Sequence, residues 1–407
     1  MNLKSHVFSA FAVAAAVAIA TPANAQQSEI AQLRTQIEEL QARLDKLDEA
    51  NKKSAEAAAK ASPAVTSRFP LTVSGLLQVH SLNYFSQNGP GTQPADTFRL
   101  RRGELRITAP RITDRVSGTI QIDPAKASFR SRVPFNAGPG PINVNTRARD
   151  SLLQEIQISY LLNKGANANY IDAGQFKIPI GYESLLSSGS LPFVERSLIF
   201  SQRDPFDGGY GDVRDTGVQL RGTRGKVDYR LGVFNGFGDR QNDLAISDPK
   251  AILGRLAFRL NENAEIGVSG GIGNTGTGAG APRADRNLLN AFAAYKKGKL
   301  SFQGEYLTGD SQLQNGANVR DIQGYYAGLG YLFTPKIEGT FRYDYLDTNK
   351  AVGNADVRDL ILGLNYYIRG NNAKIQTNIV KRNGNVGAPA DLQNDRVELR
   401  TNLQVSF

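Results

Sequence analysis

From Leu71 to the C-terminus, the chain is a succession of segments of roughly ten residues in which apolar and polar side chains alternate. Clusters of Gly, Asn, Asp and Pro separate these segments, which is typical of β-strands joined by turns. In the last segment, Val397, Leu399, Leu403 and Val405 alternate with polar or charged residues. Long charged rows opposite apolar rows do not suit a soluble β-sandwich, whose strands are shorter and whose one face is core.

Sixteen such segments can be counted, and short and long connections alternate between them. An even strand number, alternating turns and loops, and apolar-out, polar-in pairs predict an antiparallel transmembrane β-barrel. About 9–11 residues suffice for a strand to cross a membrane. A soluble sandwich with aromatic core positions remains the alternative. The segments begin near Leu71, Thr97, Val116, Ser151, Tyr170, Asp215, Val227, Ala251, Ala264, Leu288, Lys299, Ile322, Lys336, Arg358, Ala373 and Asp395.

The first 25 residues have the features of a secretory signal peptide. Lys4 precedes an apolar stretch, Val7 to Ala20, and the small-residue motif Ala-Asn-Ala ends at Ala25. A transmembrane anchor, the alternative, needs about 20 apolar residues. We expect the mature chain to begin at Gln26 and to leave the cytoplasm.

Residues 26–60 differ from everything that follows, because their apolar residues recur at spacings of three and four. This heptad pattern predicts an oligomeric coiled-coil stem, with a lone amphipathic helix as the alternative. An Ala-rich run leads into a linker at 61–70, and the barrel occupies 71–407. The heptad residues are Ile30, Leu33, Ile37, Leu40, Leu44 and Leu47.

Cys and His, which many enzymes use for catalysis or metal binding, are scarce in this chain. The chain has no Cys and two His, one of which, His6, lies in the predicted signal peptide. Thiol catalysis, disulfides and thiolate metal sites are therefore excluded, and a Ser-His-Asp triad is hard to build. We expect no enzyme activity, no metal site and no cofactor. An outer-membrane hydrolase would have to use His80, which we interpret instead as a residue of the aromatic girdle.

If the apolar positions face lipid, their neighbours line the barrel interior. In the second segment Arg102 and Arg106 then point inward, whereas Phe98 and Leu100 have the opposite phase, which predicts a bulge or a strand end near Arg101 and Arg102. Applied throughout, this rule gives a nearly neutral interior of ten cations and nine anions. A wet, charged interior indicates a pore.

Most of the formal charge of +10 is concentrated in one span. Residues 97–150 hold eleven basic residues against four acidic ones, and the loop 124–150 within them has a net charge of +4. At the extracellular mouth, this field would concentrate anions, and arginine forks would bind oxyanions. The alternative is that these arginines bind lipopolysaccharide or only solvate the rim.

Three motifs, together with the pair Arg101 and Arg102, carry a family resemblance. They are GQFKIP at 174–179, VERSL at 194–198 and DVRDTG at 212–217. The chain resembles the phosphate-selective porin family, the O and P type. The resemblance implies a sixteen-stranded homotrimeric barrel whose third loop (178–214) folds inward, with an arginine ladder leading to a phosphate site. In this loop three arginines face five acidic residues, which favours a broader channel.

The resemblance also implies which residues contact anions, with Arg101 and Arg102 as the arginine pair and Asp123 as its acidic partner. Lys177, Ser187 and Ser188 would form the loop contribution. The residues expected to line the pore are Arg101, Arg102, Arg106, Asp123, Lys177, Arg196, Arg255, Arg259, Arg342 and Arg400, with Ser187 and Ser188 as secondary candidates.

The sequence thus predicts an all-β fold, a sixteen-stranded antiparallel porin barrel preceded by a short coiled-coil helix. It would sit in the outer membrane of a Gram-negative bacterium with its stem in the periplasm, contacting lipid and lipopolysaccharide. It would pass small anions such as phosphate, and we expect no nucleic-acid partner. An unselective porin, and a barrel that tethers the envelope through its stem, remain alternatives.

Overall fold

The computed structural model divides the chain into two units, Met1–Arg68 and Phe69–Phe407. In the first unit, residues 35–43 are helical, and Arg43 pairs with Glu39 one turn earlier at 2.9 Å. The predicted signal peptide, most of the heptad stem and nearly all of the linker lie outside the described residues. No described helix is long and apolar enough to cross a membrane. The structure describes residues 35–43, 45–46, 48–49, 70–88, 95–110, 112–128, 152–201, 213–237, 250–275, 284–313, 316, 318–388, 392–393 and 395–407.

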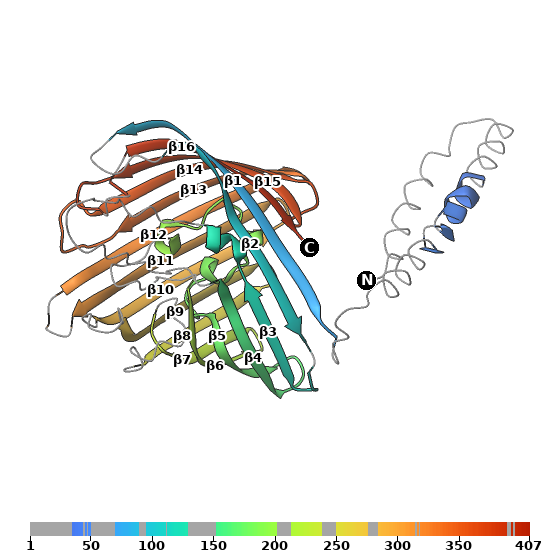
Figure 1. Ribbon diagram of the computed structural model, residues 1–407, viewed down its shortest axis with the longest axis horizontal. Helices are drawn as coiled ribbons and strands as arrows, with labels where there is room; N and C mark the ends of the chain where they lie inside the picture. The colour runs from blue at the N-terminus through green and yellow to red at the C-terminus, as the bar shows by residue number, and fades with distance from the viewer. Residues whose placement is uncertain are drawn as a thin grey trace, which may run out of the picture. The chain divides into compact units, whose positions relative to one another are not determined.

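The second unit is a closed antiparallel barrel in which each strand pairs with its neighbours in sequence and β1 pairs with β16 (Figure 1). This confirms the predicted fold class. The strands are β1 (Thr72–Asn88), β2 (Thr97–Ala109), β3 (Val116–Ile122), β4 (Leu153–Asn163), β5 (Asn169–Lys177), β6 (Arg214–Arg224), β7 (Val227–Phe234), β8 (Ala251–Asn261), β9 (Ala264–Thr275), β10 (Ala284–Lys297), β11 (Leu300–Leu313), β12 (Asn318–Thr334), β13 (Ile337–Asp347), β14 (Asp356–Tyr367), β15 (Ala373–Gly384) and β16 (Asp395–Ser406).

Every predicted segment corresponds to a strand, and most starts agree within two residues. The two largest differences are β10 and β12, which begin at Ala284 and Asn318 and so start earlier than predicted. In both, the ladder of paired residues continues beyond the apolar alternation into polar residues. Backbone pairing needs no apolar side chain, so alternation marks the membrane-crossing part of a strand rather than its full length.

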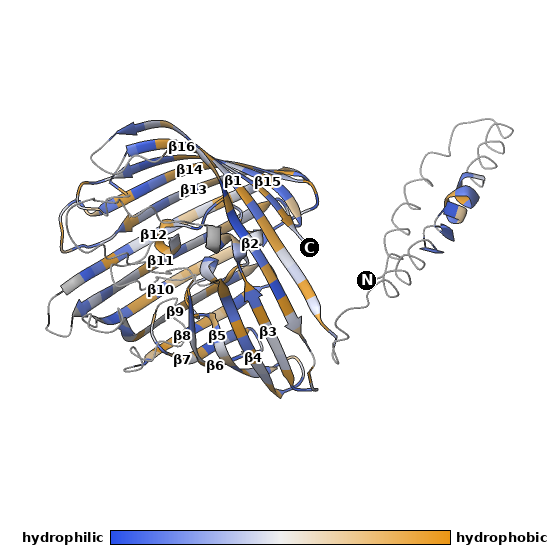
Figure 2. Ribbon diagram, in the orientation of Figure 1, coloured by the Kyte–Doolittle hydropathy of each residue, from blue (hydrophilic) through white to orange (hydrophobic). Residues whose placement is uncertain are grey.

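Alternation along each strand separates two faces. In β14, Leu360, Leu362 and Leu364 are 41–56% exposed, whereas the neighbouring Asp359 and Asn365 are buried. Figure 2 shows the same alternation of hydrophobic and hydrophilic residues around the barrel. An apolar outer face suits lipid, and closure leaves no strand edge without a hydrogen-bonding partner there.

Strand β2 contains the expected bulge. Gln78 of β1 lies opposite Arg102, but the next residue, Val79, lies opposite Leu100. Arg101 is therefore the extra residue, and the side chains on its two sides change phase relative to one another. The bulge brings three arginines of one strand, Arg99, Arg101 and Arg102, toward the interior.

The interior is not uniformly polar, which corrects the rule that apolar positions face lipid. A buried apolar cluster lies inside the barrel on β5, β7, β8 and β10 to β14, where each of its strand residues is at most 4% exposed. The long connection after β5 supplies its other half through Ile180 and residues 198–200. The strand residues include Phe234, Leu253, Leu288, Leu307 and Leu346.

Candidate functional site

The connection between β5 and β6, described over residues 178–201 and at Val213, is hydrogen-bonded to the inner wall. It contains η4 (Glu183–Leu185), η5 (Ser188–Ser190) and the short helix α3 (Leu198–Ser201). At its start, the carboxylate of Glu305 accepts the backbone N–H groups of Tyr182 at 2.9 Å and Glu183 at 2.7 Å. Arg255 Nε donates to the Gly181 carbonyl at 3.0 Å.

Gly181 has a positive φ of 74°, which favours glycine. A Cβ atom there would lie 2.6 Å from the Phe200 ring and 2.7 Å from a Glu305 oxygen. The turn that places the connection against the wall therefore needs glycine at this position.

Further along, the connection crosses the interior toward β14 and β15. The Leu191 carbonyl accepts from Lys374 Nζ at 2.8 Å, and the Pro192 carbonyl accepts from Asn365 Nδ2 at 2.9 Å. The Val194 N–H donates to Asn378 Oδ1 at 2.8 Å. Side chains from the far wall thus hold the backbone of this segment, which we call the inner loop (residues 178–201), inside the barrel.

The tip of the inner loop reaches the bulge of β2 through Glu195. We call this contact, formed by Glu195 with Arg99 and Arg101, the latch. The carboxylate of Glu195 accepts from Arg99 at 2.6 Å and from Arg101 at 2.7 and 3.0 Å, and it lies 3.6 Å from His80 Nδ1. Burial acts to raise the pKa of Glu195, but the charge of Arg101, its hydrogen bond and the charge of Arg102 hold that pKa well below its usual value. Sequence reasoning counted Glu195 as loop charge and as part of the VERSL motif but gave it no role in the site, and it did not place Arg99 there.

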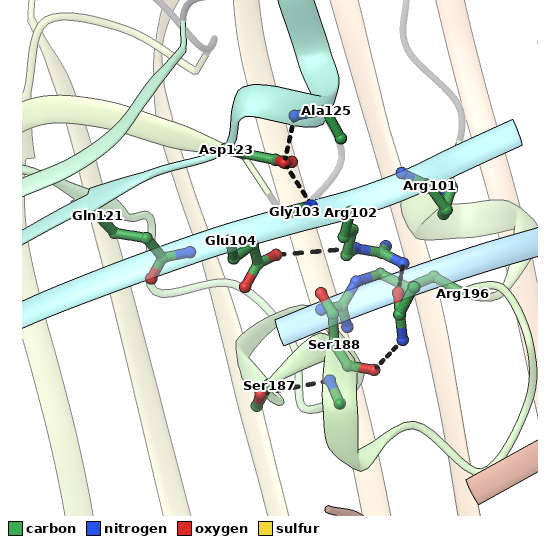
Figure 3. Close-up of polar contacts among 12 residues, drawn as sticks. Arg101, Arg102, Gly103, Glu104, Gln121, Asp123, Ala125, Ser187, Ser188 and Arg196 are labelled. Atoms are coloured by element: carbon green, nitrogen blue, oxygen red, sulfur yellow. Dashed lines mark hydrogen bonds and ion pairs between the residues drawn. The ribbon is translucent and has the colours of Figure 1, made fainter. Parts of the chain in front are cut away.

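Arg102 is 6% exposed and follows Arg101 on the same strand (Figure 3). Its Nη1 donates to Gln78 Oε1 at 2.7 Å, and its Nε lies 3.8 Å from Glu104. Gln78 in turn donates to the Ser188 carbonyl of the inner loop at 3.5 Å. Arg102 therefore contacts the inner loop through Gln78.

The prediction that Asp123 is the acidic partner of the arginine pair is wrong. Asp123 accepts the backbone N–H groups of Gly103 at 2.8 Å and Ala125 at 3.2 Å, at the start of η3 (Pro124–Ser128) (Figure 3). It substitutes for a backbone acceptor where β3 ends beside β2. Glu195 is the carboxylate that pairs with Arg101.

Three predicted pore arginines hold the inner loop in place. Arg196 donates to the carbonyls of Glu183 and Leu186, the latter at 2.9 Å. Arg342 donates to the Glu195 carbonyl at 3.0 Å and pairs with Asp344. Arg255 contacts the Gly181 carbonyl and pairs with Glu265 at 2.6 Å. Their guanidinium groups position the loop.

A cavity of about 550 Å³ lies between the inner loop, β1 to β6, the turn between β14 and β15, and the C-terminal end of the chain at Ser406 and Phe407. It brings together the predicted Arg106, Lys177, Ser187 and Ser188. Arg106 donates to Gln121 at 2.8 Å and pairs with Glu155, whose other oxygen accepts from Arg214 at 3.1 Å. Lys177 Nζ donates to the Ser184 and Leu186 carbonyls at 2.6 and 3.0 Å.

The remaining two predicted residues lie elsewhere. Arg400 of β16 pairs with Glu398 and lies opposite Leu82 of β1. On the same strand, β1, His80 lies two residues earlier and opposite Arg99 of β2. Arg259 is exposed near the end of β8. Neither lines the cavity.

His80 faces the interior and is fully buried, so its interpretation as a girdle residue is wrong. Within the part of the chain that the structure describes, neither of its ring nitrogens has a hydrogen-bond partner. The same residues contain no group of three or more His, Cys, Asp or Glu side chains that could hold a metal ion.

A closed sixteen-stranded barrel with an apolar outer face, a charged interior and a loop folded into that interior defines a porin. The chain belongs to the family described as "Putative beta-barrel porin-2, OmpL-like", whose model matches residues 70–394. Porins are channels, and this fold is not typical of enzymes. The match supports a porin family, but not the O and P type that the sequence resembles.

Solved structures share the fold at low sequence identity. The anion-selective porin from Comamonas acidovorans is 14% identical with a TM-score of 0.55, and the match covers 83% of this chain and 99% of that one. For the outer membrane channel DcaP of Acinetobacter baumannii these values are 12%, 0.54, 83% and 97%. For the trimer form of OmpT from Vibrio cholerae they are 11%, 0.52, 83% and 99%. No curated protein matches the sequence.

Proposed function

We propose that this porin allows passive diffusion of small anions, phosphate among them, across the outer membrane of a Gram-negative bacterium. The observation that carries the proposal is the excess of cations beside the inner loop. Five cations line the cavity or the latch at its tip, against three carboxylates. They are Arg99, Arg101, Arg106, Lys177 and Arg214, against Glu104, Glu155 and Glu195.

No bond is made or broken in this function. The positive potential raises the local concentration of anions, and the carboxylates keep the binding weak enough for anions to leave. Glu155 lies between Arg106 and Arg214, so each cation is already partly compensated. This balance favours a channel for small anions in general over a tight phosphate site.

The decisive measurement is the reversal potential of the purified porin in a planar bilayer under a KCl gradient. We expect the sign that corresponds to chloride preference. A cation preference would refute the proposal, and a potential near zero would favour an unselective porin. Phosphate that reduces the chloride current would extend the proposal to phosphate as a bound solute.

We also propose a homotrimer with a cleaved signal peptide and a periplasmic coiled-coil stem. One structural neighbour is named a trimer form, and residues 35–43 are helical. Chemical cross-linking of the purified porin should give trimers, and N-terminal sequencing should begin at Gln26. In the tethering alternative, deletion of residues 26–60 weakens the envelope and leaves conductance intact.

A further inference from the structure

The cavity beside the inner loop has two unlike walls. On the barrel side, Arg106, Lys177 and Arg214 alternate with the carboxylates Glu104 and Glu155. On the loop side, residues 185–190 line the cavity and include the serines Ser187, Ser188 and Ser190, and two amides, Asn371 and Asn372, lie at the adjoining turn. The barrel wall thus offers charges together with the polar side chains of Ser74, Gln121 and Ser406, whereas the loop wall offers hydroxyl groups and no charge.

The charged wall carries three cations and two carboxylates, an excess of one positive charge. The side chain of Arg106 is 41% exposed, so part of its guanidinium is open to the cavity. A single negative charge on a ligand balances this wall, whereas a dianion exceeds it and meets the repulsion of Glu104 and Glu155.

The carboxylates restrict the ligand further, because ionised carboxylates only accept hydrogen bonds. Chloride has no donor for them, and phosphate at neutral pH keeps at most two O–H groups, whereas an organic anion that carries several hydroxyl groups has a donor for each carboxylate and for the loop. The same hydroxyl groups can donate to, and accept from, the loop serines and the asparagine amides. Complementarity to this lining therefore needs both one negative charge and several hydroxyl groups.

Size and apolar lining point the same way. A cavity of about 550 Å³ falls within the range of roughly 300–1,000 Å³ that is typical of sites for organic ligands. The side chains of Leu76, Leu185 and Leu186 also line it. They suit the C–H faces of a sugar ring, for which a small inorganic ion has no counterpart.

We propose that this cavity is a binding site for hydroxylated organic monoanions of the sugar-acid type. The inference rests on the proposed anion passage, which it narrows to a solute class. Arg106 binds the carboxylate of the ligand, and the hydroxyls of Ser187 and Ser190, both exposed, bind the ligand's hydroxyl groups.

The test measures the block of KCl current through single channels by glucuronate, acetate, glucose and inorganic phosphate. Acetate carries the charge without the hydroxyls, and glucose carries the hydroxyls without the charge. Half-block by glucuronate is expected at a concentration about tenfold below that of each of the other three, which is the effect of one additional charge-assisted hydrogen bond. Acetate or phosphate that blocks as well as glucuronate would overturn the proposal.

Two variants locate the site. Arg106→Gln should weaken the glucuronate block about tenfold, and the double variant Ser187→Ala, Ser190→Ala about threefold, with acetate almost unaffected by the latter. The matched control is Arg224→Gln, an exposed arginine at the end of β6 that does not line the cavity. If Arg106→Gln and Arg224→Gln change the glucuronate block equally, the cavity does not contain the binding site.

Open-channel current in KCl alone shows whether each variant still folds into a channel. The serine variant keeps the test valid if Arg106→Gln does not assemble. The reversal potential, measured without organic solutes, is a separate readout. Anion preference combined with an undistinguished glucuronate block would leave the proposed function standing and reject this site.

Discussion

The two halves of the barrel interior are built by different rules. In the packed sector, on β7 to β14, the inner loop covers apolar side chains such as Phe234, Leu253 and Leu307, each with 0% exposure. In the open sector, on β1 to β6, charged side chains line a cavity and pair with one another. The inner loop lies between the two sectors, with an apolar face toward one and serines toward the other.

The difference shows how a porin can narrow its lumen without a second domain. Burial of apolar surface, worth about 25 cal/mol per Å² removed from water, fixes the inner loop against the packed sector. The open sector contributes polar contacts instead, such as those of Lys177 with the Ser184 and Leu186 carbonyls and of Arg101 with Glu195, and its other charges line the cavity. The apolar packing and the charged lining of the cavity can therefore be changed separately, by substitutions in different sectors.

The largest effect is expected from Leu253→Ala in the packed sector. Leu253 is fully buried against the inner loop, and its truncation leaves a cavity that should lower the free energy of unfolding by about 3–5 kcal/mol. Leu256→Ala is the matched control, because Leu256 lies in the same strand but is 52% exposed on the outer face. Urea unfolding in lipid vesicles measures both, and equal losses would contradict a packed sector.

Removal of the Glu305 carboxylate should have the next largest effect. Glu305→Ala leaves the N–H groups of Tyr182 and Glu183, and the Tyr326 hydroxyl, without their acceptor. We expect a loss of about 2–3 kcal/mol together with a larger and noisier single-channel current, because the inner loop is released.

Asp172→Ala is the control for that prediction. Asp172 is just as buried but accepts from Ser159, Gln219 and Arg221 of the barrel wall and makes none of these contacts with the inner loop. Its removal should destabilise the barrel without adding current noise. Similar current noise in both variants would show that the contacts of Glu305 with the inner loop are not what holds the loop in place.

The strand layout could be predicted because lipid imposes a period of two on each outer face. The inner face has no such constraint. Leu253 and Leu307 read as lipid-facing by their type, yet they point inward, because the inner loop covers them. The local sequence pattern gives the type of each residue, but it does not indicate which distant segment of the same chain covers that residue.

The candidate site was predicted only in part for the same reason. Lys177 and Ser187 do line one cavity with Arg106. The roles of Arg342 and Glu195, however, depend on a contact between residues 147 positions apart, which no spacing encodes. The backbone role of Asp123 follows from where β3 ends, and the alternation did not define that boundary.

His80 offers a smaller effect at the border of the open sector. Its imidazole is fully buried and neither ring nitrogen has a hydrogen-bond partner among the described residues. Replacing an unsatisfied buried polar group by an apolar one of similar size should be neutral or stabilising, so His80→Leu is expected to raise the free energy of unfolding by about 1 kcal/mol or less. A loss above 2 kcal/mol would mean that the imidazole is bonded. If the wild-type protein hydrolyses esters and His80→Leu does not, that result would support the hydrolase alternative.

The smallest expected effect concerns Glu195, which joins the two sectors. Its carbonyl accepts from Arg342 on the packed side, and its carboxylate pairs with Arg99 and Arg101 of β2. Because its pKa is well below the usual value, the stabilisation from these pairs is complete above a pH of about 4.3. It is lost only as the pH falls through the lower pKa of the folded protein.

Glu195→Gln removes this negative charge at neutral pH and exposes the potential of the two arginines. A unit charge about 10 Å away in water changes the energy of a passing anion by about 0.4 kcal/mol, and that of a cation by about the same amount in the opposite sense, so its removal should raise the anion-to-cation permeability ratio about fourfold. The wild type should reach that ratio only in strong acid, whereas the variant should have it at pH 7 and show no further rise from this group. Asp114→Asn is the control, because its carboxylate is 90% exposed and therefore screened. If the ratio rises between pH 6 and pH 5 equally in the wild type and in the variant, the titrating group is another carboxylate. The latch then does not control ion selectivity.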